Sequence, residues 1–136
     1  MLSIIYYTET GNTEAMAEAI KDGAEEAGKE VRLLAVDDAS EADVKEADAV
    51  LFGCPAKGDE EIEDLEFRPF LESVMEDLKD KKVGIFGSYA WNDGEWIENW
   101  KKEMEENGVE IVEALKAFDY PDADALEECK ELGKNF

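Results

Sequence analysis

Runs of consecutive apolar residues alternate along the chain with runs in which apolar residues recur every three or four positions. The first pattern is typical of strands buried on both faces of a parallel sheet, and the second of amphipathic helices. The alternation predicts an α/β fold, in which right-handed connections place a parallel sheet between two layers of helices. The apolar runs predict five strands, at residues 2–7, 31–36, 49–53, 83–89 and 109–115.

Helix signals fall between these strands. The first helical run starts at Glu14 and stops at Gly28, a residue that favours helix ends. Ser40 and Asp43 have the spacing of a capping box and predict a short helix before the third strand. Three later helices have their apolar positions within residues 67–78, 96–104 and 126–132. The chain is therefore predicted to be one doubly wound domain, residues 1–136.

Charge and cysteine content exclude several classes of protein. The chain has 14 basic and 37 acidic residues, so its net charge of −23 disfavours binding to nucleic acid or anionic membranes. The acidity either favours basic protein partners or serves solubility or a high-salt habitat. Without histidine, a Cys/His zinc site and a Ser-His-Asp triad are excluded. Cys54 and Cys129 are predicted to be small buried thiols, not a disulfide framework.

Targeting signals are not evident in the sequence. The first strand follows Met1 directly, so we expect no signal peptide. No apolar run approaches the roughly 20 residues that a membrane-spanning helix needs. These features predict a soluble, reduced, cytoplasmic protein.

The loop at residues 8–13 is the first candidate site. It joins a strand to a helix, and its three threonines and one asparagine offer neutral donors beside the positive end of the helix dipole. No lysine or arginine precedes Lys21, so the loop itself supplies no counter-charge. The same residues also suit a capped turn that binds nothing. The loop alone therefore leaves a phosphate site and a plain turn as alternatives.

Other loops are expected to meet the first one at the carboxyl edge of the sheet, where ligands bind in such folds. These are residues 55–64 and 89–94 and the turn near Asp119. Trp91 follows a strand and either stacks on a ligand or covers a loop, whereas Trp96 and Trp100 have the helical spacing of core residues. The acidic residues 59–64 are by default a solvated loop. A ligand with a phosphate and a flat ring would span these loops.

Three motifs at matching spacing resemble those of short-chain flavodoxins of anaerobic bacteria. They are the phosphate-loop motif at residues 8–13, Gly-Cys-Pro-Ala-Lys-Gly-Asp-Glu at 53–60, and Gly-Ser-Tyr-Ala-Trp-Asn-Asp-Gly at 87–94. The resemblance extends over essentially the whole chain, including an uninterrupted fifth strand. It implies a three-layer α/β/α, doubly wound, five-stranded parallel sheet with the flavodoxin-like strand order 2-1-3-4-5.

The resemblance also implies non-covalently bound FMN. It implies that Trp91 stacks on the outer flavin face, that Glu60 accepts a hydrogen bond from flavin N3–H, and that the Lys57–Gly58 peptide flips on reduction. Glycine suits such a flip because it tolerates positive φ. The cofactor site implied in this way comprises Thr8, Glu9, Thr10, Gly11, Asn12, Thr13, Pro55, Ala56, Lys57, Gly58, Asp59, Glu60, Ser88, Tyr89, Ala90, Trp91, Gly94 and Asp119.

Two positions depart from the family pattern. Lys57 stands where relatives usually have methionine on the inner flavin face, and Asp119 stands where asparagine is expected near the ribityl chain. The Lys57 ammonium either extends into water, with its stem on the ring, or contacts the flavin and favours its reduced, anionic form.

The resemblance implies that the chain is a low-potential one-electron carrier and not an enzyme. It would cycle between the neutral semiquinone and the anionic hydroquinone of FMN, as a monomer, with redox partners that dock through basic surfaces. The alternative is an FMN-dependent reductase of a small substrate or quinone. A phospho-receiver domain on the same fold is disfavoured, because Cys54 and Pro55 follow the third strand where a phosphorylatable aspartate is needed.

Overall fold

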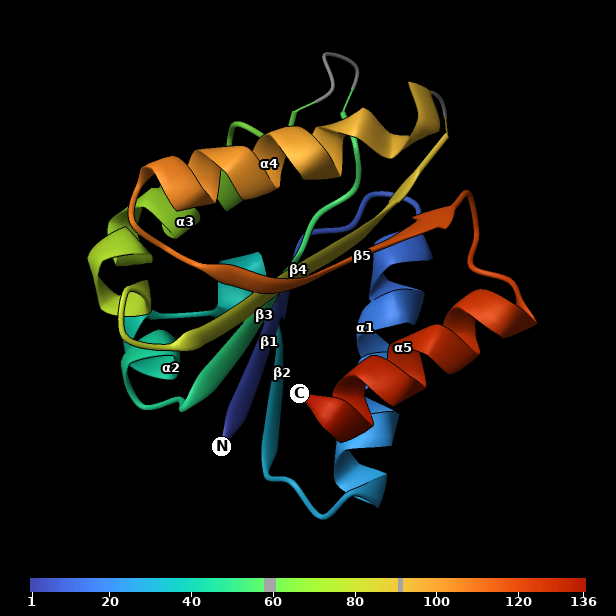
Figure 1. Cartoon of the computed structure of the whole chain (residues 1–136), viewed down its shortest axis with the longest axis horizontal. Helices are drawn as coiled ribbons and strands as arrows, with labels where there is room; N and C mark the ends of the chain where they lie inside the picture. Colours follow the sequence, from blue (N-terminus) through green and yellow to red (C-terminus); the bar gives the residue numbers. More distant parts are fainter. Residues whose placement is uncertain (58–60, 91) are drawn as a thin grey trace.

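The computed structural model describes residues 1–57, 61–90 and 92–136, and within them five parallel strands form one sheet (Figure 1). The order across the sheet is β2-β1-β3-β4-β5, which confirms the predicted topology. The strands are β1 (Leu2–Tyr6), β2 (Val31–Ala35), β3 (Ala49–Gly53), β4 (Lys82–Tyr89) and β5 (Ile111–Phe118).

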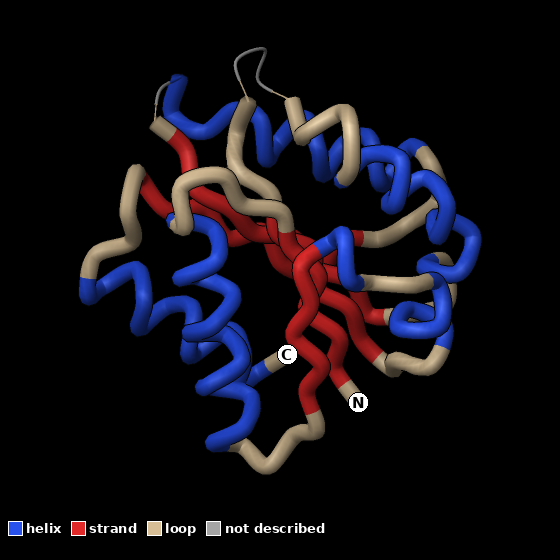
Figure 2. The backbone as a smooth tube through the Cα atoms, turned by 180° about the vertical axis from the view of Figure 1, so that it is seen from behind, coloured by secondary structure: helices blue, strands red, loops and turns tan. Residues whose placement is uncertain are grey.

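Helices cover both faces of the sheet, as the view in Figure 2 makes plain. One face carries α1 (Asn12–Glu26) and α5 (Ala123–Asn135), and the other carries α2 (Glu41–Lys45), α3 (Phe67–Val74) and α4 (Glu95–Glu106). Short 3₁₀ turns occupy η1 (Val36–Asp38), η2 (Met75–Leu78) and η3 (Asn92–Gly94). The predicted three-layer architecture is confirmed.

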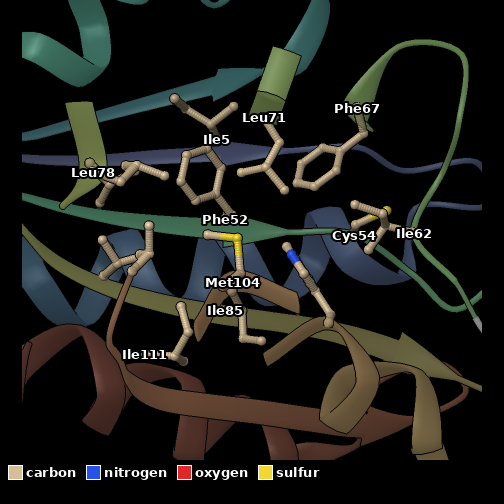
Figure 3. Close-up of a cluster of buried hydrophobic side chains, with 14 of the residues drawn as sticks. Ile5, Phe52, Cys54, Ile62, Phe67, Leu71, Leu78, Ile85, Met104 and Ile111 are labelled. Atoms are coloured by element: carbon tan, nitrogen blue, oxygen red, sulfur yellow. The ribbon is translucent and has the colours of Figure 1, made fainter. Parts of the chain in front are cut away.

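Successive strand residues point into two separate cores, because the side-chain period of a strand is two. Ile4 packs toward α1 and α5, whereas Ile5 packs toward α3 and α4, and both are fully buried. In the second core (Figure 3), Phe67 makes edge-on contacts with Phe52 at 6.2 Å and with Trp100 at 5.5 Å between ring centroids. The core role predicted for Trp100 and its neighbour Trp96 is confirmed.

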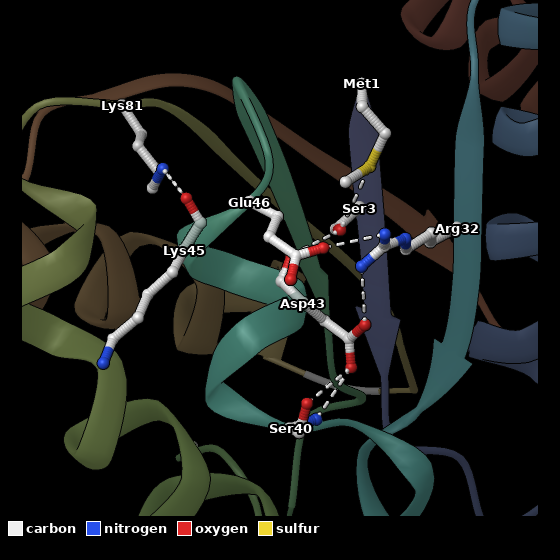
Figure 4. A network of polar contacts seen from close by, with 8 residues as sticks. All are labelled: Met1, Ser3, Arg32, Ser40, Asp43, Lys45, Glu46 and Lys81. Carbon is white, nitrogen blue, oxygen red and sulfur yellow. Dashed lines mark hydrogen bonds and ion pairs between the residues drawn. The ribbon is translucent and has the colours of Figure 1, made fainter.

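The capping box predicted at the start of α2 is present (Figure 4). The Asp43 carboxylate accepts from the Ser40 backbone N–H at 2.8 Å and from its hydroxyl at 3.1 Å. Arg32 of β2 donates to Asp43 at 3.1 Å and to Glu46 at 2.9 Å. The Ser3 hydroxyl of β1 donates to the Asp43 carbonyl at 2.7 Å. These contacts tie the short helix α2 to β1 and β2.

The bounds of α1 and β5 differ from those that the sequence pattern predicts. The first helix begins at Asn12 and not at Glu14, because the left-handed Gly11 turns the chain directly into it. The fifth strand spans Ile111–Phe118 and not residues 109–115. Val109 is buried because it closes the end of α4, where its N–H donates to the Met104 carbonyl at 3.0 Å. Its apolar character therefore reflects core packing, while the later residues pair with the end of β4.

Glycines allow α1 and α5 to cross in direct backbone contact. A Cβ at Gly23 would lie 2.0 Å from the Lys130 carbonyl oxygen, and one at Gly133 would lie 2.0 Å from that of Ile20. Both distances are impossible for a side chain, so the crossing depends on two missing methyl groups. The crossing fixes the position of α1, whose first turn faces the carboxyl edge of the sheet.

We therefore predict that Gly23→Ala lowers the free energy of unfolding by about 1–3 kcal/mol, the usual cost of overpacking. The sign is diagnostic, because alanine at an uncrowded helix position would stabilise by about 1 kcal/mol. Chemical denaturation of the variant and of the exposed control Asp22→Ala measures the effect. A stability gain in Gly23→Ala would show that the crossing tolerates a side chain.

Candidate functional site

The carboxyl ends of the central strands bring the predicted loops together. Tyr6 pairs with Gly53, and Gly53 pairs with Phe86, so β1 and β3 end side by side while β4 continues to Tyr89. A cavity of about 190 Å³ opens at this edge. It is lined by Thr8, Glu9, Thr10, Asn12, Thr13, Pro55, Ala56, Ser88, Tyr89, Ala90 and Asp119. Each of these residues belongs to the predicted site.

The first loop presents the N-terminus of α1 to the cavity. Gly11 caps the helix with φ of 91°, a conformation that penalises any side chain. Its N–H donates to the Thr8 hydroxyl oxygen at 3.0 Å, which leaves the Thr8 hydroxyl hydrogen available to another acceptor. The next N–H groups have no acceptor within the helix and carry its positive dipole end. The arrangement suits an anion held by neutral donors.

The hydroxyl groups of Thr13 and Ser88 lie beside this helix turn and line the cavity; this pair is called the hydroxyl floor below. Thr13 is fully buried and Ser88 is 5% exposed, and their hydroxyl oxygens lie 3.5 Å apart. One comes from α1 and the other from β4, so the contact joins the first loop to the strand that carries the third. Hydroxyl hydrogens rotate, so this pair can turn donors toward an acceptor in the cavity.

The third loop and the end of β5 close another side of the cavity. Asp119 has φ of 55°, and its N–H donates to the Tyr89 carbonyl at 2.7 Å. The Tyr89 ring packs between Trp96, at 5.8 Å, and Phe118, at 5.5 Å between centroids. Gly94 adopts φ of 75° beside Tyr89 but does not line the cavity.

The second loop continues the strand pairing before it leaves the sheet. The Cys54 and Ala56 N–H groups donate to the Phe86 and Ser88 carbonyls, each at 3.0 Å. The Lys57 N–H then donates to the Glu61 carbonyl at 3.0 Å. The predicted residues Gly58, Asp59, Glu60 and Trp91 lie outside the described residues.

Lys57 has a partner in the first loop that the sequence analysis did not consider. Its ammonium forms an ion pair with the Glu9 carboxylate of the first loop. Lys57 lines a second hollow, of about 350 Å³, and Glu9 lines both this hollow and the first one. The first loop has no basic residue of its own, so the second loop supplies its counter-charge.

Glu63 is a structural residue of the site that the sequence analysis missed, since it was assigned to a solvated acidic loop. Only 5% of it is exposed, and its carboxylate accepts from the N–H groups of Leu65, Glu66 and Phe67 at 2.7–2.8 Å. Burial raises its pKa, but these donors outweigh burial and leave the pKa below its usual range. The carboxylate thus caps α3 and anchors the end of the second loop. Glutamate is an unusual capping residue, so the sequence carries little signal for this role.

Burial and hydrogen bonding also set the pKa of other groups at this edge. The Lys57 hydrogen bond, followed by one from Tyr7 at 3.0 Å, lowers the pKa of Glu9. Burial and then Glu9 raise the pKa of Tyr7 to about 12. Burial raises the pKa of Cys54 to about 12, so its thiol stays protonated and unreactive. The packing role predicted for Cys54 and Cys129 is confirmed.

Two further findings concern the described part of the chain as a whole. Within it, no group of histidine, cysteine, aspartate or glutamate residues has the geometry to hold a metal ion. None of the helices described there is long and apolar enough to cross a membrane. A hollow of about 600 Å³ between β5 and α5 is larger than the cavity described above, but it lies away from the loops at the carboxyl edge.

The sheet order and the cavity place the chain in a class of proteins, the doubly wound α/β proteins with a 2-1-3-4-5 sheet. In this class, ligands bind at the switch point beyond the carboxyl ends of the strands. The family model described as "Flavodoxin" matches residues 4–133. The chain is 42% identical to the flavodoxin of Megasphaera elsdenii over 98% of this chain and 96% of that one, and 38% identical to that of Clostridium beijerinckii over 98% and 96%.

Solved structures agree with these sequence matches. The solution structure of two-electron reduced Megasphaera elsdenii flavodoxin superposes with a TM-score of 0.90, covering 98% of this chain and 96% of that one. A flavodoxin from the domain Archaea, 30% identical, gives 0.87 over 99% and 95%. The chain belongs to the flavodoxin family, whose members bind FMN and carry electrons; it is an electron-transfer protein, not an enzyme.

The Glu63 cap predicts a defined pH dependence. The pKa of Glu63 is lower in the folded protein than in the unfolded chain. The ionised carboxylate therefore stabilises the folded protein at any pH above the unfolded-state pKa. This stabilisation is lost as the pH falls through the folded-state pKa. Glu63→Gln should therefore unfold more easily than the parent chain by about 1–3 kcal/mol at pH 7. The difference should shrink on acidification below pH 4.

Denaturant titrations between pH 7 and pH 3 measure this difference, with the exposed Glu66→Gln as the control. A difference that stays constant across this range would rule out an ionised cap.

The hydroxyl floor predicts how the site distinguishes FMN from riboflavin, which lacks the phosphate. Thr13→Val should weaken FMN binding about tenfold, since a hydrogen bond to a charged group contributes about 1.5 kcal/mol or more. Riboflavin binding should change little. Quenching of flavin fluorescence measures both affinities, and an equal loss for the two ligands would place the phosphate elsewhere.

Proposed function

We propose that this flavodoxin is a low-potential one-electron carrier that cycles mainly between the neutral semiquinone and the anionic hydroquinone of non-covalently bound FMN. The observation that carries the proposal is a cavity that offers hydroxyl and amide donors but, among its described lining residues, no lysine or arginine, in a chain of net charge −23. Such a site can hold a phosphate without placing a strong positive field beside the ring. FMN supplies the redox chemistry, and the protein tunes it.

The cavity supports a division of the site into two ends. We assign the phosphate to the loop after β1 and the two buried hydroxyls beneath it. We assign the ring to the region of Ala56, Tyr89 and Ala90, with Asp119 near the ribityl chain. Gly58, Asp59, Glu60 and Trp91 remain predicted ring contacts, implied by the family motifs.

The proposed low potential follows from charge. Each electron added without a proton places negative charge on the flavin, within an acidic protein and beside its own phosphate. One charge at ~8 Å and an effective dielectric constant near 20 contributes ~2 kcal/mol before salt screening. At ~59 mV per tenfold change, this corresponds to roughly 90 mV per charge. Several uncompensated carboxylates therefore suffice for a strong depression of the second potential.

Partner binding is proposed to occur around the cavity. Flavodoxins work with redox partners, and here the net charge favours partners with basic docking surfaces. Exposed apolar side chains near the site can add contact area: Phe118 is 62% exposed and packs on Tyr89, which lines the cavity. We further propose that the chain acts as a monomeric single domain in the cytoplasm.

Stepwise reduction by dithionite tests the proposal directly. The FMN-loaded protein should accept one electron and develop the long-wavelength absorption of a neutral flavin radical, then accept a second electron at a much lower potential. The visible spectrum and the number of electrons added measure both steps. A single two-electron step would contradict the proposal, and steady-state oxidation of NAD(P)H by the protein alone would favour the reductase alternative.

A further inference from the structure

The ion pair between Lys57 and Glu9 bridges two loops that come from different strands. Glu9 lies in the loop after β1, and Lys57 lies in the loop after β3. The side chains are 47% and 34% exposed, so each charge is partly shielded from water. Because Glu9 lines both hollows and Lys57 lines the second, the pair stands at their junction.

Neighbouring hydrogen bonds hold both partners in place. The Tyr7 hydroxyl donates to Glu9 Oε1 at 3.0 Å, the same oxygen that Lys57 contacts. On the other side, the Lys57 backbone N–H donates to the Glu61 carbonyl at 3.0 Å. The Glu9 carboxylate therefore has two donors, and a hydrogen bond anchors the Lys57 backbone.

We propose that the Glu9–Lys57 ion pair tunes the redox potential of the bound flavin, because the negative charge of Glu9 offsets the positive charge of Lys57. This inference rests on the proposed function. An isolated ammonium at the rim would stabilise the electron added to the flavin and raise the potential. An isolated carboxylate would do the opposite. Two opposite charges in contact form a dipole, whose field falls off faster than that of either charge.

The pair therefore explains how a lysine can stand beside the cavity of a low-potential carrier. The relevant step is the transfer of one electron, without a proton, from a reductant to the singly reduced flavin. Removing one partner exposes the charge of the other to that step. Removing both restores neutrality. The pair is thus a tuning device, while the hydrogen bonds of the site hold the cofactor.

A double-mutant cycle tests this inference on the FMN-loaded protein, with dithionite as reductant and redox dyes as reference. Glu9→Gln should raise the second one-electron potential and Lys57→Met should lower it. We expect each to change the equilibrium ratio about threefold to tenfold, or about 30–60 mV at ~59 mV per tenfold change. The double variant should return to within about twofold of the parent ratio. Each single shift should shrink in 0.5 M salt, since these charges are partly exposed.

A matched control comes from an ion pair away from the carboxyl edge. Lys79 and Glu76 lie 3.0 Å apart in and beside η2, and the variants Lys79→Met and Glu76→Gln make the same charge changes. They should shift the potential much less than their counterparts at the rim. Equal shifts from both pairs would show that only net charge matters and would overturn a local role.

A measurement without cofactor checks that Glu9 contacts Tyr7 in the apoprotein, as its position in the ion pair requires. The pKa of Tyr7 is raised by burial and then by Glu9, so Glu9→Gln should lower it from about 12. Ultraviolet titration measures the tyrosinate, and Tyr7→Phe identifies its contribution. An unchanged titration would show that Glu9 does not contact Tyr7.

The potentials and the binding data separate the two levels of inference. If both single variants shift the potential in the same direction, or neither shifts it, the tuning role is wrong even though FMN binds and accepts electrons singly. If the parent chain binds no FMN or takes up electrons only in pairs, the proposed function itself fails.

Discussion

The structure depends on placing the N-terminus of α1 at the carboxyl edge of the sheet. The first turn of this helix supplies the dipole and the free N–H groups that a phosphate needs, and a chain of net charge −23 offers few other sources of positive potential. Gly11 allows the abrupt entry into the helix, and Thr8 holds that entry in place. Toward the C-terminal end of α1, the crossing with α5 at Gly23 and Gly133 fixes the axis of α1.

The acidic side chains Glu9 and Glu63, which lie at the site, both have hydrogen-bond donors within the protein. Glu63 is buried, but three backbone N–H groups satisfy its carboxylate and turn it into the cap of α3. Glu9 lies at the cavity, but Lys57 and Tyr7 both donate to it. Lys57 therefore offsets the charge of Glu9 at the cavity, while Glu63 keeps its charge and uses its hydrogen-bonding capacity on the helix. The remaining acidity is spread over the surface, where salt screens it and where partners approach.

Much of the fold could be predicted because the apolar pattern is strong. Strands buried on both faces need continuous apolar runs, and the helices between them need one apolar face, so both leave clear periodicities. The fifth strand was misplaced because Val109 is apolar for another reason: it closes the end of α4. A pattern of hydrophobicity reports burial, and it does not tell a strand residue from a residue that seals a helix end.

The site divides in the same way. The sequence by itself determined which loops meet and which neutral donors they carry, because motif spacing and strand order are local and topological properties. Only the tertiary structure decided that Lys57 pairs with Glu9, that Glu63 caps a helix, and that Thr13 contacts Ser88. Two of these contacts join residues 48 and 75 positions apart. Each residue contacts its partner because the fold brings their loops close together. The sequence near either residue gives no information about that distance.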